Sequence, residues 1–377
     1  MIDGTNGDIR NDPNQGCPIS SNHRPGEVSN VYGNITIEKL IPLVEKGQMA
    51  LIDVRSPAEF QNFTIPGSIN IPIFTDEERA EIGTLYTQIG DAVARDRGLE
   101  IVSGKLSEFI RQFKEIEGEK TVFCWRGGMR SRTTATLLDL MNIRVYKLEG
   151  GIRAYRKWVV SQLEQISLPE KSFLLHGKTG SGKTKIIREL EKDGYPALDL
   201  EKMANHRGSI FGHIGKNPYN QKKFEALLLQ RLRELVGAPY LIFEAESSKI
   251  GKVTLPPCML RQKEKSQTIV IELPLEERIR AILEDYRPWE HQEECLEAFR
   301  RIKERIHTPI AKEIERALLD EKYTEAVQYL LEYYYDRRYK GISREFPEGQ
   351  VLVVKANTVE EAARRVKEIL PEKVRQW

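Results

Sequence analysis

The chain has 377 residues and carries 58 lysines and arginines against 56 aspartates and glutamates, so its net charge is only +2. This length allows two domains with separate hydrophobic cores, and no stretch approaches the roughly 20 apolar residues of a membrane helix. Neither a secretory signal nor the cysteine spacing of a disulfide framework or a structural zinc site is recognisable. We therefore expect a cytoplasmic protein without a structural metal or a membrane contact. The sequence does not fix the oligomeric state, and a monomer is our expectation.

Residues 1–34 are rich in Asn, Asp, Gly, Pro and Ser and lack apolar periodicity, which predicts a disordered tail. Residues 35–165 then alternate short apolar strands with helices, and this pattern predicts a parallel α/β sheet. One helix start is explicit, because Ser56, Pro57 and Glu59 occupy the N-cap, N1 and N3 positions of a capping box. The strands expected in this domain cover residues 50–55, 65–72, 121–125 and 145–151.

The pattern restarts near residue 170, and residues 170–377 predict a second parallel α/β domain. A strand at 172–177 leads into a glycine-rich loop and a helix, and further apolar runs follow. From about 275 to 340 the chain is mostly helical and heavily charged, which predicts a helical subdomain. This half of the chain is mildly basic and permits a polyanionic partner without requiring one. The last strand is expected at 351–356, before a terminal helix.

Segment 124–131, with the sequence CWRGGMRS, joins a strand to a helix, and we call it the thiol loop. Its two glycines let backbone amides turn inward at the positive end of the helix, and its two arginines add charge. Such surroundings favour a thiolate that attacks an electrophilic sulfur, selenium or phosphorus atom. The alternative is a buried, inert cysteine at a strand end. The candidate residues are Cys124 as the catalytic residue and Arg126, Gly127, Gly128, Met129, Arg130 and Ser131 as the anion-binding loop.

Segment 177–184, GKTGSGKT, fits the pattern G-x-x-x-x-G-K-T between a strand and a helix, and we call it the phosphate loop. Its amides would cradle a phosphate, Lys183 would bridge phosphate oxygens, and Thr184 would offer a hydroxyl to Mg²⁺. Glu244 ends an apolar strand and would hold metal-bound water or accept a proton, unless it is simply a surface carboxylate. The motif predicts a P-loop NTPase-like fold but not the ligand, because any pyrophosphate ester would fit where ATP usually binds. The candidate residues are Gly177, Lys178, Thr179, Gly180, Ser181, Gly182, Lys183, Thr184 and Glu244.

Basic residues next to aromatic ones suggest a nucleic-acid surface in the second domain. Segment 204–218 is rich in glycine and basic residues, a basic cluster lies on an expected helix near residue 300, and segment 333–340 reads YYYDRRYK. Aromatic rings can stack on bases while arginines and lysines contact phosphates. Solvated helical faces and ordinary core tyrosines are the alternative. The candidate tRNA-binding residues are His206, Arg207, Arg300, Arg301, Arg337, Arg338 and Lys340.

Residues 35–160 resemble a rhodanese domain through IDVRSPAEF, IPGSINIP, the thiol loop and LEGGIRAY. In that family the loop cysteine carries a persulfide or related adduct. The C-x5-R spacing from Cys124 to Arg130 is one residue longer than the usual sulfur-transfer loop. It matches the length found in rhodanese-fold phosphatases, which implies an anion larger than thiosulfate.

The two loops in this order resemble the bacterial tRNA 2-selenouridine synthases across nearly the whole chain. FTDEERAEIGTLY, CWRGGMRS, GKTGSGKT and ANHRGSIFG carry this resemblance. It implies a rhodanese-like α/β domain followed by a P-loop domain with a helical, mildly basic C-terminal region. It also implies that wobble 2-thiouridine in tRNA is alkylated on sulfur by geranyl diphosphate and that selenium from selenophosphate then displaces the S-geranyl group. A selenophosphate-supplying enzyme would be a partner.

Two other readings of the sequence stay open at this point. A rhodanese-type sulfurtransferase or phosphatase could be fused to an ATP-dependent kinase, and turnover of thiosulfate or an aryl phosphate would favour this reading. A nucleotide-switched RNA-binding protein would instead bind tRNA tightly and have an unreactive Cys124.

Overall fold

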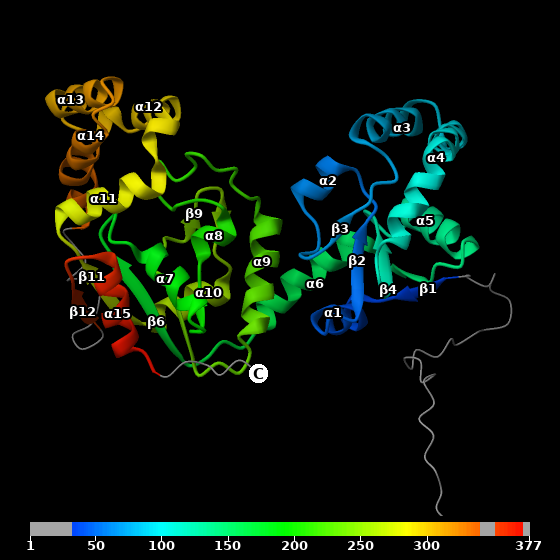
Figure 1. The fold of residues 1–377 in the computed structure, drawn as a ribbon, viewed down its shortest axis with the longest axis horizontal. Helices are drawn as coiled ribbons and strands as arrows, with labels where there is room; N and C mark the ends of the chain where they lie inside the picture. Colours follow the sequence, from blue (N-terminus) through cyan, green and yellow to red (C-terminus); the bar gives the residue numbers. More distant parts are fainter. Residues whose placement is uncertain (1–31, 340–350, 372–377) are drawn as a thin grey trace, which may run out of the picture.

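The structure, a computed structural model, describes residues 32–339 and 351–371. Each half of the chain forms a parallel five-stranded sheet with helices packed around it, as Figure 1 shows. The predicted parallel α/β architecture is therefore confirmed in both halves. Within the described ranges, no helix has the length and apolar character needed to cross a membrane.

The first sheet has the strand order β1-β5-β4-β2-β3. Gly33 and Asn34 belong to its edge strand β1, which pairs in parallel with β5. The predicted tail is therefore wrong for these two residues, because the backbone of β5 offers them a hydrogen-bonding partner; residues 1–31 lie outside the described residues. The elements are β1 (Gly33–Ile35), α1 (Ile37–Glu45), β2 (Met49–Asp53), α2 (Pro57–Asn62), β3 (Ile69–Asn70), α3 (Asp76–Gln88), α4 (Asp91–Lys114), β4 (Glu119–Phe123), α5 (Met129–Leu140), β5 (Val145–Leu148) and α6 (Gly151–Gln165).

The second sheet has the order β12-β11-β6-β8-β7, with β6 at its centre. Its buried strands are almost wholly apolar because helices cover both faces. The elements are β6 (Lys171–Gly177), α7 (Lys183–Lys192), β7 (Ala197–Leu198), α8 (Leu200–Ala204), α9 (Gln221–Glu234), β8 (Tyr240–Glu244), β9 (Lys249–Ile250), β10 (Val253–Thr254), α10 (Pro257–Lys265), β11 (Gln267–Glu272), β12 (Val351–Lys355) and α15 (Val359–Ile369).

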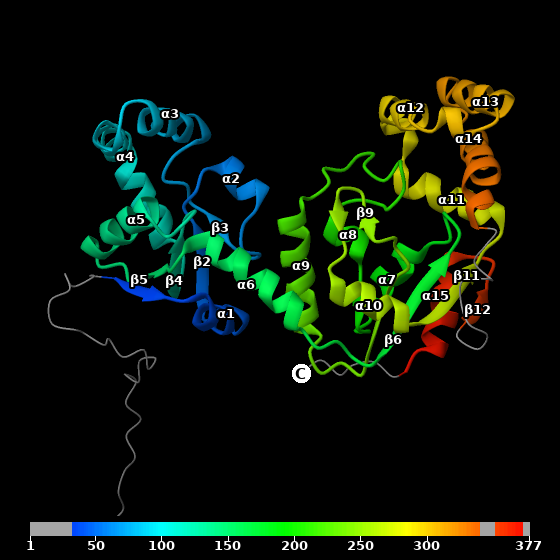
Figure 2. The same ribbon diagram turned by 180° about the vertical axis from the view of Figure 1, so that it is seen from behind.

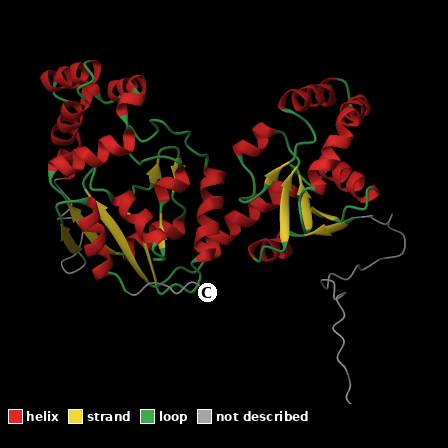
Figure 3. Ribbon diagram, in the orientation of Figure 1, coloured by secondary structure: helices red, strands yellow, loops and turns green. Residues whose placement is uncertain are grey.

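Residues 275–339 form a helical arm beside the second sheet, clearly separate from the strands in Figure 3. The arm has its own apolar cluster, which also includes Phe211 and Ile214 from the loop after α8. Its last turns include a π-helix, a form that often occurs at functional sites. The elements are α11 (Leu275–Tyr286), η1 (Pro288–Glu290), α12 (Gln292–Arg300), η2 (Lys303–Arg305), α13 (Thr308–Leu319), α14 (Tyr323–Leu330), η3 (Leu331–Tyr335) and η4 (Asp336–Tyr339).

The two halves are joined through α6 and α9, which lie side by side in Figures 1 and 2. One apolar cluster spans this junction, because it contains Tyr155 and Val159 of α6 together with Leu229 of α9. Polar contacts add to it. Arg233 forms an ion pair with Glu45 at 2.7 Å. The junction is therefore a shared core rather than an open linker.

Candidate functional site

The thiol loop follows β4, and hydrogen bonds from the start of α6 hold its backbone. The carbonyl oxygens of Cys124 and Trp125 accept hydrogen bonds from the amides of Ile152 and Arg153, at 2.9 and 3.3 Å. Gly151 makes this approach possible, because a Cβ atom at that position would lie 2.3 Å from the Cys124 carbonyl oxygen. The backbone around the thiol is therefore held in one position.

Within the loop, the thiol of Cys124 is buried, with 3% of the residue exposed. Its Sγ atom lies 3.2 Å from the Oγ atom of the buried Ser131. The side chain of Met129, in contrast, is 48% exposed. The loop glycines lie at the transition to α5, and Gly127 has a φ of 66°, which favours glycine. Of the predicted loop residues, the structure thus brings the side chain of Ser131 against the sulfur and leaves that of Met129 exposed.

Arg130 does not point freely into this loop, because it is paired with Glu59. The Arg130 guanidinium donates hydrogen bonds to both oxygens of the Glu59 carboxylate. Burial raises the pKa of Glu59, but the hydrogen bond and charge of Arg130 outweigh this effect and leave that pKa below its ordinary value. Arg126 is exposed and forms no ion pair with any described residue. An incoming anion would therefore meet Arg126 first and would compete with Glu59 for Arg130.

Sequence reasoning assigned Glu59 only a capping role. It fills that role, since its carboxylate accepts a hydrogen bond from the Ser56 amide at 3.2 Å, and the predicted capping box is confirmed. The pairing with Arg130 is long-range, between residues 71 positions apart. No local pattern in the sequence signals such a contact.

The phosphate loop connects β6 to α7. Gly180 and Gly182 have φ values of 82° and 71°, and a side chain at Gly182 would collide with Val359. The ammonium group of Lys183 donates to the Gly177 carbonyl oxygen at 3.0 Å, across the loop. Ser181 is buried, and its hydroxyl has no hydrogen-bond partner among the described residues. The loop therefore has a donor available for a bound oxyanion.

Buried carboxylates line the edge of the sheet next to this loop. Glu244 is 1% exposed, so it is not a surface carboxylate. Its Oε2 atom accepts a hydrogen bond from the Leu200 amide at 3.0 Å, while Oε1 lacks a partner among the described residues. Burial raises the pKa of Glu244 well above its ordinary value, and nearby carboxylates add to the shift. Glu244 is therefore placed to take up or hold a proton.

Two further carboxylates, Glu201 and Glu246, were missed in the sequence. The Thr184 hydroxyl donates to Glu201 at 2.8 Å, and Glu246 lines the cavity in front of the loop. Burial, together with the charge of Glu246, raises the pKa of Glu201 to about 7. The sequence could have revealed them, because Glu201 and Glu246 follow the ends of the parallel strands β7 and β8. Ligands bind at this edge of such sheets. In the described ranges, no group of three or more His, Cys, Asp or Glu residues could hold a metal ion.

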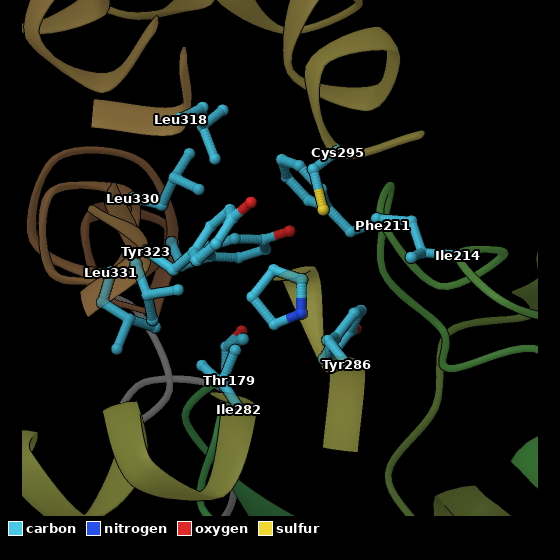
Figure 4. A pocket seen from close by; sticks show the side chains of 13 residues that line it. Thr179, Phe211, Ile214, Ile282, Tyr286, Cys295, Leu318, Tyr323, Leu330 and Leu331 are labelled. Atoms are coloured by element: carbon cyan, nitrogen blue, oxygen red, sulfur yellow. The ribbon is translucent and has the colours of Figure 1, made fainter. Parts of the chain in front are cut away.

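Two cavities open at the phosphate loop. The larger has a volume of about 740 Å³ and is bounded by the loop, by Glu201, Glu246 and Lys263, and by the end of the helical arm. The smaller, shown in Figure 4, has a volume of about 60 Å³ and is almost entirely apolar. Burial raises the pKa of Cys295 in its wall to about 11, so this thiol is not ionised near neutral pH. The two cavities share four lining residues, Thr179, Ile282, Tyr286 and Tyr335.

The candidate tRNA-binding residues do not form one surface. His206 is 7% exposed, accepts a hydrogen bond from the Gly208 amide, and has its pKa lowered to about 4 chiefly by burial. Arg207 pairs with Asp285 at 2.7 Å and lines the larger cavity. Arg338 lines it too, stacked 4.0 Å from the ring centre of Tyr334. Of the other candidates, Arg337 lies over Tyr333, Arg300 and Arg301 are exposed at the end of α12, and Lys340 is outside the described residues.

Comparison with known proteins gives matches along most of the chain. A family model described as the tRNA 2-selenouridine synthase AAA domain matches residues 170–369, and a rhodanese-like domain model matches residues 36–157. A protein named tRNA 2-selenouridine synthase from Nitrosomonas europaea is 37% identical over 63% of this chain and 63% of its own length, which is less than two thirds of that relative. A protein of the same name from Sulfurovum sp. (strain NBC37-1) is 32% identical over 77% of this chain and 87% of its own.

Among solved structures, the N-terminal domain of a putative ATP/GTP binding protein from Clostridium difficile 630 is 34% identical. That match covers 34% of this chain and 99% of that chain, with a TM-score of 0.32.

Proposed function

The chain belongs to the tRNA 2-selenouridine synthase family, and from this premise we propose that it replaces the sulfur of wobble 2-thiouridine in tRNA by selenium. The reaction takes place in two steps, with geranyl diphosphate and selenophosphate as substrates and S-geranyl-2-thiouridine as the intermediate. A separate enzyme supplies the selenophosphate in the cytoplasm. A thiocarbonyl sulfur is a poor leaving group, and alkylation turns it into a good one.

In the first step the phosphate loop grips the diphosphate of geranyl diphosphate. The thiouridine sulfur forms a bond to the first carbon of the geranyl chain, the bond from that carbon to oxygen breaks, and diphosphate leaves with the electron pair. The proton on N3 of the base is lost. Lys183 and the loop amides stabilise the negative charge that develops on the leaving group. The hydroxyl of Thr184 and the carboxylate of Glu201 are oxygen ligands of the kind Mg²⁺ prefers and would hold it against the diphosphate, where it would neutralise charge.

In the second step the thiol loop delivers selenium. Cys124 binds or relays the selenium of selenophosphate, while Arg126 and the loop amides hold the phosphate oxygens. The selenium of selenophosphate forms a bond to C2 of the base, and the geranyl thiolate leaves with the electron pair of the broken carbon–sulfur bond. Water then cleaves the phosphorus–selenium bond, which releases phosphate and leaves selenium on C2. The contact between the Cys124 sulfur and the Ser131 hydroxyl supports this role, because a hydroxyl donor stabilises a thiolate.

The observation that carries the choice of geranyl diphosphate over ATP is the apolar cavity beside the phosphate loop. Figure 4 shows aliphatic and aromatic side chains facing one another there, among them Leu318, Leu330 and Phe211. A diphosphate with an apolar tail would place its head in the larger cavity and the end of its chain in the smaller one. Burial of apolar groups of the chain would add roughly 0.8 kcal/mol per CH₂.

The function is tested by incubating the protein with 2-thiouridine-containing tRNA, geranyl diphosphate and selenophosphate. The tRNA is then digested, and the masses of its nucleosides are measured by mass spectrometry. We expect selenouridine, and the S-geranyl nucleoside when selenophosphate is omitted. Unchanged 2-thiouridine in tRNA that binds the protein would contradict the proposal.

The cavity is tested separately with Val327→Trp. Val327 lines the cavity, and the larger tryptophan side chain would occupy part of its space. This variant should lose transfer from geranyl diphosphate but keep transfer from the shorter dimethylallyl diphosphate. Val236→Trp, at a position that is 74% exposed, is the matched control. Undiminished geranyl transfer by Val327→Trp would exclude this cavity as the site of the tail.

A further inference from the structure

The mouth of the thiol loop carries an exposed aromatic side chain whose surroundings differ from those of an ordinary surface residue. Trp125, which directly follows the buried Cys124, is 41% exposed. Its carbonyl oxygen accepts a hydrogen bond from the Arg153 amide at 3.3 Å, which links its backbone to α6. Met129, the first residue of α5, is also exposed. Trp125 and Met129 are thus two exposed apolar side chains of the loop that carries the nucleophile, and we call them the apolar rim.

Three exposed arginines are close to this rim in the chain or through a backbone contact. Arg126 is the next residue along the loop, Arg132 lies on the same face of α5 as Met129, and Arg153 donates its amide to Trp125. Among the described residues, none of the three has a carboxylate partner within ion-pairing distance. Arg55 and Arg130 in the same half of the chain are both paired. The positive charge of the three arginines near the exposed indole is thus not neutralised by a carboxylate of the described residues.

We propose that Trp125 is a stacking platform for a nucleotide of the tRNA anticodon loop, which it holds with the C2 atom of the base over Cys124. The inference rests on the proposed function, because that function makes RNA the ligand of this face. Arg126, Arg132 and Arg153 contact phosphates on either side of the stacked nucleotide. Single-stranded RNA is bound by this combination of an aromatic face and surrounding positive charge.

The platform also explains how a buried sulfur can reach its target. A base in a stacked anticodon loop presents only its edges, and C2 lies in the plane of the ring. A base turned out of the stack and laid on the indole keeps one face covered while its other face and edge are open to an attacking selenium atom. The energy lost on unstacking is recovered on Trp125.

The first test follows fluorescence during titration with an anticodon stem-loop RNA that carries S-geranyl-2-thiouridine. Stacking of a base on an indole quenches its emission, so the wild-type protein should be quenched and Trp125→Phe should not. The other tryptophans give the baseline in both proteins. Equal quenching of the two proteins would overturn the proposal.

The second test measures selenation of the same RNA with free selenophosphate, so that the alkylation step is bypassed. Trp125→Ala should react about 5- to 150-fold more slowly at limiting RNA concentration, which corresponds to the loss of one stacked base. Trp125→Phe should recover most of the rate because it keeps an aromatic face. Tyr86→Ala removes an aromatic side chain that is 60% exposed on α3 and should behave like the wild type.

The outcomes separate this inference from the proposed function. If the wild-type protein leaves the RNA unchanged but is still quenched through Trp125, the platform stands and the proposed chemistry fails. If Trp125→Ala selenates the RNA at the wild-type rate, the platform is wrong and the chemistry stands. If Trp125→Ala is slow only when the selenophosphate-supplying enzyme replaces free selenophosphate, the exposed indole docks that protein rather than RNA, and the proposal is overturned.

Discussion

Cys124 and Ser131 lie in contact inside a loop whose backbone is fixed, so removal of the sulfur should leave the rest of the loop in place. We expect Cys124→Ala to abolish selenation of geranylated tRNA and to leave geranylation of thiolated tRNA unchanged. Mass analysis of the digested nucleosides measures both steps. Cys258→Ala removes a buried thiol outside both loops and serves as the control. An equal loss of both steps in Cys124→Ala would contradict the assignment of selenation to the thiol loop and of geranylation to the phosphate loop.

Lys183 is the counterpart in the phosphate loop, where its ammonium group reaches across to the Gly177 carbonyl oxygen. Lys183→Ala should lower the rate of geranylation about 100-fold or more, because one donor to the developing charge is lost. Selenation of RNA that is already geranylated should continue. Lys185→Ala, two residues further along the same helix and paired with Glu360, tests whether any loss of positive charge from this helix has the same effect. Loss of both activities in Lys183→Ala would contradict the assignment.

The Glu59 to Arg130 pair predicts a dependence of stability on pH. Because folding lowers the pKa of Glu59, its contribution is complete above the ordinary value of 4.5 and is lost as the pH falls through the lower folded-state pKa. Glu59→Gln should therefore cost about 1 kcal/mol at pH 7, between the values for exposed and buried pairs. The difference from the wild type should shrink below pH 4.5, and urea titrations at both pH values measure it. A cost that does not change with pH would exclude the ion pair as its cause.

At the scale of elements, the junction between the thiol loop and α6 depends on glycine. Gly151 has a φ of 57° and faces the Cys124 carbonyl oxygen, so Gly151→Ala meets both backbone strain and a collision. We expect a loss of at least about 1–3 kcal/mol in unfolding free energy together with slower selenation. Gly104→Ala is the matched control, because a Cβ there meets no atom within 4 Å. It should stabilise α4 by about 0.5–1 kcal/mol, and a similar loss in both variants would refute the steric argument.

Elements whose signals are local were predictable from the sequence. The capping box that starts α2 and the strand, loop and helix around Lys183 involve residues within a few positions of one another. The edge strand β1 was not predicted. It has only three residues, and it forms by pairing with the backbone of β5, which is distant in the sequence. The apolar cavity could not be predicted either, since Thr179, Phe211 and Leu331 meet there only after the helical arm has packed against the phosphate loop.

At the scale of the whole molecule, the two halves share a core through α6 and α9. A core that crosses the junction couples the unfolding of its two sides, so calorimetry should show a single cooperative transition. A pair of resolved transitions would indicate that the halves are thermodynamically independent. The sequence could not show which residues form this shared core. The apolar face of an amphipathic helix such as α6 or α9 could equally pack within its own domain.

The orientation of the two sheets has a consequence for the order of events. In Figures 1 and 2 the strands β2 and β6 run toward the same side of the molecule, and the thiol loop and the phosphate loop follow the ends of the parallel strands β4 and β6. The shared core joins the two halves, and under the proposed function the tRNA moves from one loop to the other. A tRNA held by one loop is present at the other at a high effective concentration. The alkylated tRNA should therefore be captured for selenation faster than it escapes, and it should accumulate in solution only when the supply of selenium stops.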